Sequence, residues 1–71
     1  MDTTLDAAIA KFPSTFGLRA FPGETFRVSR SASYMSGPTP MLYTQRLCED
    51  GTWGDFAKGT TEELLRNVVK L

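Results

Sequence analysis

Five residues in the middle of the chain combine guanidinium groups with aromatic rings: Arg27, Arg30, Tyr34, Arg46 and Trp53. A guanidinium group binds carboxylates and phosphates through its fork of N–H donors, and an aromatic ring stacks on bases or anchors an interface. These residues therefore predict a binding surface, and their spacing leaves open whether its target is a protein or a nucleic acid. The alternative is that Arg27 merely faces solvent and that both rings belong to the core.

The chain shows no residue pattern for catalysis or metal binding. Histidine is absent and Cys48 is the only cysteine, which excludes a disulfide within the chain and the common zinc sites. The stretch "GTWGDFAKGT" matches neither glycine-rich phosphate-binding signature. We therefore expect a non-enzymatic protein that uses no metal and no cofactor.

Composition limits the classes of partner and compartment. Eight basic residues balance eight acidic ones, which disfavours a general nucleic-acid binder that gains its affinity by neutralising phosphates. No stretch approaches the roughly 20 apolar residues of a membrane-spanning helix. We expect a protein without membrane contact in the cytoplasm of a bacterial host. Residues 1–71 form one small domain, and its marginal core favours stabilisation by a second copy.

A helix of about residues 4–12 and a strand of about residues 25–35 are predicted for the first half of the chain. The turn signal Pro22-Gly23 is expected to separate this strand from the residues before it. Alternation then collects on one face Phe26, Val28, Arg30, Ala32 and Tyr34. Because an unpaired charge on a core face is costly, Arg30 must reach solvent, pair with a carboxylate or meet a partner.

The stretch "MLYTQRLCEDGTWGDFAKG" predicts a hairpin, because an Asp-Gly pair between two β-like runs is a strong turn signal. Strands of about residues 41–49 and 52–58 then flank a two-residue turn at positions 50–51. This register places Arg46 opposite Asp55. Both faces of such a hairpin are partly apolar, and the surplus favours a further interface, such as that of a homodimer.

The last segment, "TTEELLRNVVKL", begins with a capping box. Thr60 is the expected N-cap, and Glu63 is the residue at the third helical position that reaches back to it. A helix of about residues 61–70 follows. The order of elements predicts an α+β two-layer sandwich, in which a three-stranded antiparallel sheet is flanked by an N-terminal and a C-terminal helix.

These features favour protein binding as the function. We expect a homodimer that occupies the surface of a partner protein, with arginines on acidic groups and rings as anchors. Small size, neutral charge and the lack of a metal or disulfide pattern are typical of accessory proteins of phages and mobile elements, including inhibitors of host defence proteins. The alternative is a nucleic-acid or nucleotide-binding regulator that uses the same arginines and rings, with binding that weakens steeply in salt.

Overall fold

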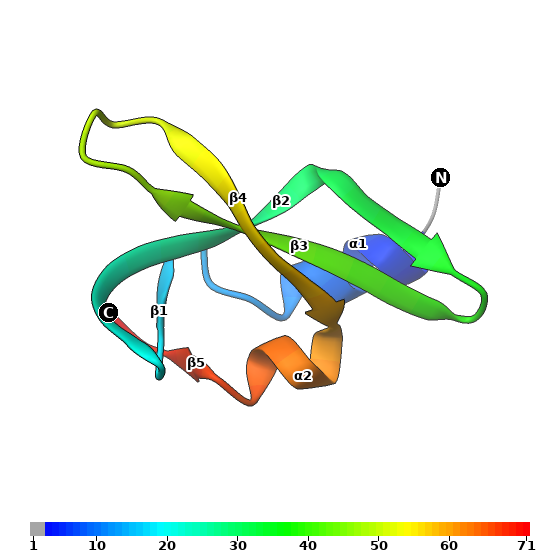
Figure 1. The fold of residues 1–71 in the computed structure, drawn as a ribbon. Coiled ribbons are helices and arrows are strands. Elements are labelled where there is room, and N and C mark those ends of the chain that lie inside the picture. Colours follow the sequence, from blue (N-terminus) through cyan, green and yellow to red (C-terminus); the bar gives the residue numbers. More distant parts are fainter. Residues whose placement is uncertain (1–2) are drawn as a thin grey trace.

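Figure 1 shows the computed structural model, which describes residues 3–71 and consists mainly of strands. Its elements are α1 (Thr3–Ala10), β1 (Phe16–Leu18), β2 (Phe21–Ser36), β3 (Thr39–Leu47), β4 (Trp53–Thr60), α2 (Thr61–Leu65) and β5 (Val68–Val69). The strands form one antiparallel sheet in the order β4-β3-β2-β1-β5. The predicted two-layer sandwich with a three-stranded sheet between two helices is therefore wrong, because the sheet has five strands and the helices are short.

The C-terminal segment explains much of this difference. The predicted helix of residues 61–70 ends at Leu65, and the chain then runs antiparallel to β1 with Val68 opposite Leu18. Adjacent β-branched residues such as Val68 and Val69 favour a strand over a helix, because their side chains lose rotamer freedom against a preceding helical turn. The apolar spacing that suggested a longer helix belongs instead to a helix followed by an edge strand.

The start of α2 is as predicted. The Thr60 hydroxyl accepts a hydrogen bond from the Glu63 N–H, and the Glu63 carboxylate accepts one from the Thr60 N–H. This reciprocal pair satisfies two N–H groups that a helix N-terminus otherwise leaves open. The prediction of a capping box is confirmed.

The first half of β2 departs from the predicted strand of residues 25–35. β2 begins at Phe21, so Pro22 and Gly23 lie inside it and do not end it. Gly23 takes a φ of 85°, which glycine adopts without strain. Proline is tolerated near the start of a strand, where its missing N–H costs no ladder bond.

The second half of β2 contains an irregularity that changes which face its residues occupy. Ser29 lies opposite Tyr43 and Tyr34 lies opposite Met41, so β2 has extra residues between these two pairs. The Ser29 hydroxyl accepts a hydrogen bond from the Ala32 N–H at 3.3 Å, which stabilises the excess segment. Because facing residues share a side of the sheet, the predicted alternation is wrong beyond Ser29. Tyr34 therefore points away from the core.

The β3–β4 hairpin is present, and its register differs by one residue from the predicted one between the loop and Gln45, whereas from Thr44 onwards, opposite Ala57, a bulge restores the predicted register. A two-residue turn at positions 50–51 needs positive φ at its first residue, whereas in residues 3–71 only glycines have positive φ, Gly51 among them. The loop is longer instead: the Gly51 N–H donates to the Cys48 carbonyl at 3.0 Å, and the Cys48 N–H donates to the Thr52 carbonyl at 2.8 Å. Cys48 and Thr52 thus close the loop, and Trp53 lies opposite Leu47.

The core lies on one face of the sheet, which we call the inner face. Its fully buried side chains are those of Phe16, Phe26, Leu42 and Thr44. The two helices cover this face with Ala8 and Leu64, and Phe12, just after α1, joins the same core. In the described part of the chain, neither helix is long and apolar enough to cross a membrane.

Candidate functional site

The face of the sheet that points away from the core, here called the outer face, collects polar and aromatic side chains from three strands. Alternate residues of β3 point to it, and the register adds the residues opposite them on β2 and β4. Its main side chains are Arg27, Tyr34, Tyr43, Gln45, Leu47, Trp53, Asp55 and Lys58. Of the five predicted binding residues, this face brings together Arg27, Tyr34 and Trp53.

A chain of polar contacts crosses the outer face from β2 to β4. The Arg27 Nε donates to the Gln45 Oε1 at 2.9 Å, and the Gln45 Nε2 donates to the Asp55 Oδ1 at 3.3 Å. The guanidinium carbon of Arg27 also lies 4.3 Å from the centre of the Trp53 ring, within cation–π distance. These contacts restrict the Arg27 side chain and leave its terminal N–H groups available to a ligand.

A shallow hollow of about 390 Å³ lies beside Arg27, and it is lined by Arg27, Val28, Ser29, Arg30, Ser31 and Gln45. Two arginines thus border one opening. An Arg30 terminal nitrogen lies 2.5 Å from a carboxylate oxygen of Asp6 in α1, while 68% of the Arg30 side chain stays exposed. Arg30 is exposed and so is not a core residue, but its partner Asp6 belongs to α1, which packs on the inner face, so Arg30 lies at the margin of the side that the sequence predicted. Arg30 forms an ion pair with the Asp6 carboxylate, and pairing with a carboxylate is one of the three outcomes expected from the sequence.

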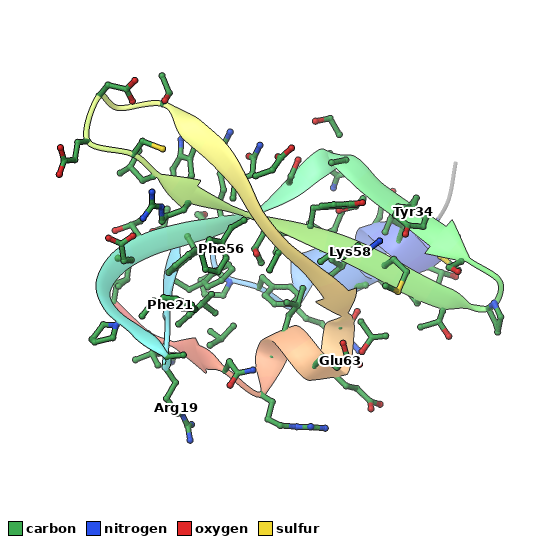
Figure 2. All side chains as sticks on the ribbon, viewed as in Figure 1. Arg19, Phe21, Tyr34, Phe56, Lys58 and Glu63 are labelled. Carbon is green, nitrogen blue, oxygen red and sulfur yellow. The ribbon has the colours of Figure 1, made fainter. Side chains whose placement is uncertain are left out.

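Tyr34 and Tyr43 form a second aromatic group on the outer face. Their ring centres lie 6.1 Å apart, and Tyr34 is 40% exposed. Lys58 lies opposite Tyr43, and Figure 2 shows it on the other side of β4 from Phe56. Sequence reasoning did not include Tyr43, Gln45 or Lys58 in the site. The alternation of β3 indicates the face of the first two, and the predicted hairpin register already places Lys58 opposite Tyr43.

Arg46 lies apart from the outer face. It is opposite Phe26 near the end of β3, and its terminal nitrogen is 3.1 Å from the Glu24 Oε2. The prediction that Arg46 faces Asp55 is wrong, because the shifted hairpin register puts Gly54 opposite it. The Arg46–Glu24 pair is exposed and therefore contributes little to stability.

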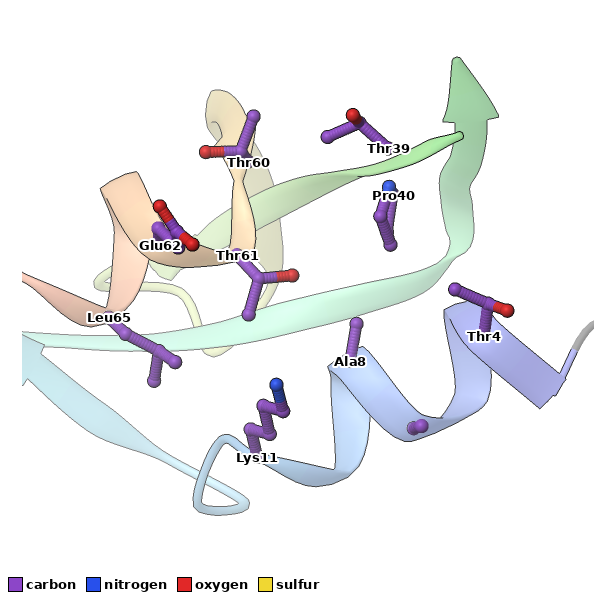
Figure 3. A pocket seen from close by; sticks show the side chains of 10 residues that line it. Thr4, Ala8, Lys11, Thr39, Pro40, Thr60, Thr61, Glu62 and Leu65 are labelled. Carbon is purple, nitrogen blue, oxygen red and sulfur yellow. The ribbon is translucent and has the colours of Figure 1, made fainter. Parts of the chain in front are cut away.

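A larger cleft, of about 820 Å³, opens between α1, α2 and the start of β3 (Figure 3). It is lined by Thr4, Ala7, Ala8, Lys11, Thr39, Pro40, Thr60, Thr61, Glu62 and Leu65. The Thr61 hydroxyl oxygen is buried and has no hydrogen-bond partner within residues 3–71. Figure 3 shows this oxygen turned towards the middle of the cleft. The walls supply hydroxyl groups, small apolar side chains and the opposite charges of Lys11 and Glu62.

The hairpin loop holds a carboxylate, that of Asp50, whose pKa is shifted from its ordinary value. The Thr52 hydroxyl and the Thr52 N–H donate to the Asp50 Oδ1 at 2.6 Å and 3.0 Å. These bonds favour the ionised form and lower the pKa of Asp50 below its ordinary value of 3.8. An Asp side chain in a turn commonly accepts a hydrogen bond from the backbone two residues later, so these contacts need no catalytic explanation. Among the described residues, no three His, Cys, Asp or Glu side chains gather into a metal site.

The outer face is thus defined by its own contacts: the Arg27 guanidinium over the Trp53 ring, a hollow that Arg27 lines together with Arg30, and a pair of partly exposed tyrosines. Comparison with known proteins gives no relative, since no family model, no curated protein and no solved structure matches the chain.

Proposed function

We propose that this protein is a non-enzymatic binding module that occupies the surface of a partner protein with the outer face of its sheet. The observation that carries the proposal is the hollow bordered by Arg27 and Arg30, next to the ring of Trp53. A carboxylate is the group that such a hollow suits, because guanidinium groups donate paired, charge-assisted hydrogen bonds to it. The partner would therefore present an acidic side chain here.

The aromatic rings of the outer face supply the apolar part of the interface. Trp53 and Tyr34 combine large contact area with few rotatable bonds, and such residues carry much of the energy of protein interfaces. Arg27 is already held by Gln45 and by the Trp53 ring. It therefore loses little conformational freedom when a partner binds, which favours affinity.

The charges of the outer face support a protein partner over a nucleic acid. Arg27 and Lys58 share this face with Asp55, which lies opposite Gln45 on the edge strand β4. A phosphate backbone meets repulsion from such a carboxylate, whereas a protein surface with mixed charges does not. The stack of Arg27 on Trp53 keeps nucleic-acid binding as the second candidate, because the same ring would stack on a base.

The test compares two charge reversals and one ring truncation in quantitative co-purification from the native host. Arg27→Glu reverses the charge at the hollow, Tyr34→Ala removes an exposed ring, and Lys70→Glu is a matched charge reversal at the exposed end of the chain. We expect wild type and Lys70→Glu to recover the same protein, and Arg27→Glu to lose about tenfold or more of it. Equal recovery of every protein by all variants, each folded by circular dichroism, would contradict the proposal.

A nuclease step and a salt series separate the two candidates. If recovery survives nuclease and falls only modestly with salt, the partner is a protein, whereas a steep decline with salt indicates phosphate contacts. The setting predicted from composition, an accessory protein of a phage or mobile element that inhibits a host defence protein, remains a prediction. The identity of the recovered protein tests it.

A further inference from the structure

The outward side of β4 is a free edge of the sheet. Within residues 3–71, β4 pairs with β3 alone and is the first strand in the sheet order. Figure 1 shows no strand beyond it. An edge strand presents unpaired N–H and C=O groups, which another strand can complete. We propose that two copies of this chain pair antiparallel through β4 and form a symmetric dimer.

The sequence of β4 is complementary to itself in one antiparallel register. If the two-fold axis passes between Phe56 and Ala57, Asp55 of each copy lies opposite Lys58 of the other. Symmetry makes this opposite-charge pair twice, once on each side of the axis. Opposite charges in facing positions stabilise antiparallel strand pairs, and like charges there destabilise them.

A bulge in β4 makes this register possible. Residues that face each other in an antiparallel pair share a side of the sheet, yet residues three apart in a regular strand point to opposite sides. Here Gln45 faces Asp55 and Tyr43 faces Lys58, with Phe56 as the extra residue, so Asp55 and Lys58 both lie on the outer face. The bend of a bulged edge disfavours an unrelated flat strand, whereas a second copy has the same bend.

Both charged groups are open to such a partner. Within the described residues, the Asp55 carboxylate accepts one hydrogen bond, from Gln45 at 3.3 Å, and Lys58 makes no ion pair. Both side chains are exposed. In the dimer, the chain of contacts that runs from Arg27 through Gln45 to Asp55 continues to Lys58 of the second copy.

The same register also covers apolar surface on the inner side of the edge. Phe56 is 36% exposed and Phe21 is 44% exposed, and their rings meet edge to face with centres 4.9 Å apart. Figure 2 labels both side chains, which lie near each other. The register places Ala57 of the second copy opposite Phe56. The ring then gains a neighbour in place of solvent, so the interface combines two ion pairs with apolar contact.

The main experiment is a charge swap in the purified protein, followed by analytical ultracentrifugation. We expect wild type to dimerise, and Lys58→Glu and Asp55→Lys each to weaken dimerisation by about tenfold or more, because each places like charges opposite each other twice. The double variant D55K/K58E restores the opposite-charge pairs and with them the dimer. Matched controls are Lys70→Glu and Glu49→Lys, which make the same charge changes at exposed positions outside β4 and leave dimerisation unchanged.

A second measurement identifies the contact directly and does not depend on the proposed partner protein. A carbodiimide joins a carboxylate to an amine without a spacer, and a mixture of isotopically light and heavy protein shows whether the joined residues come from different copies. We expect a mixed light and heavy cross-link between Asp55 and Lys58. A wild type that stays monomeric at its highest soluble concentration, or a dimer that neither the single variants weaken nor the double variant restores, overturns the proposal.

Discussion

The two faces of the sheet use the same strands in different ways. On the inner face, Phe16, Phe26, Leu42 and Thr44 are fully buried. On the outer face, the contacts are a hydrogen-bonded chain and ring pairs that remain open to solvent. Burial of apolar surface stabilises the fold, while exposed polar contacts contribute little to stability. The difference indicates that the inner face supplies most of the stability of the fold, while the outer face is the surface that we propose for binding.

The largest expected effect is on the inner face. Phe26 contacts both Phe21 and Phe56, with ring centres 6.2 Å and 4.9 Å away, and has no exposed surface. We expect Phe26→Ala to lower the free energy of unfolding by about 3–5 kcal/mol, measured by urea denaturation. The matched control on the outer face, Tyr34→Ala, changes it by less than about 1 kcal/mol. Equal losses for the two variants would remove the distinction between the faces.

A smaller effect is expected at the polar chain of the outer face. Arg27→Ala removes the cation–π contact and the hydrogen bond to Gln45, at a cost of about 1 kcal/mol or less. Trp53 is the only tryptophan, so its fluorescence reports on the loss of the guanidinium beside its ring. We expect the emission spectrum to change for Arg27→Ala and to stay as in wild type for Arg46→Ala. If both variants have the wild-type spectrum, the stacked arrangement is not formed in solution.

The smallest effect is expected at the hairpin loop, which belongs to neither face. Thr52→Ala removes the hydroxyl that donates to Asp50, so the pKa of Asp50 rises towards 3.8. Since folding lowers this pKa, the bonds stabilise the protein above the ordinary pKa, and this contribution is lost as the pH falls through the lowered value. An NMR titration of the Asp50 carboxyl carbon measures the shift. Thr39→Ala, at the far end of β3, serves as the control that leaves the titration unchanged.

The parts of the fold that sequence predicted depend on local signals. The capping box of α2 needs only Thr60 and Glu63, and it is present. The presence of a hairpin around positions 50–51 also follows from local turn chemistry. The register of the hairpin does not follow from the turn chemistry alone. It depends on the φ of residue 50, and the wider loop keeps this residue out of the left-handed region. The end of α2 was missed because the pairing of Val68 with β1 is a contact between distant parts of the chain.

The residues of the candidate site could be predicted where their selection did not depend on the register of the strands. Arg27 and Trp53 were chosen for their chemistry, and the structure stacks one on the other. Arg46 was assigned a carboxylate from the wrong register, and its partner is Glu24 instead. The contact of Arg30 with Asp6 links β2 to α1, and nothing in the spacing of the sequence indicates which of the acidic residues would be used.

The pairing of β1 with β5 has a consequence for the order of folding. Gly17 lies opposite Val69, so this pair joins segments that are far apart in the sequence, whereas β2, β3 and β4 are consecutive hairpin partners. Closing a long loop costs more conformational entropy than closing a short one, and contacts between distant residues slow folding. We therefore expect the consecutive strands β2, β3 and β4 to assemble first and the β1–β5 pair to close last, as the rate-limiting contact of the fold.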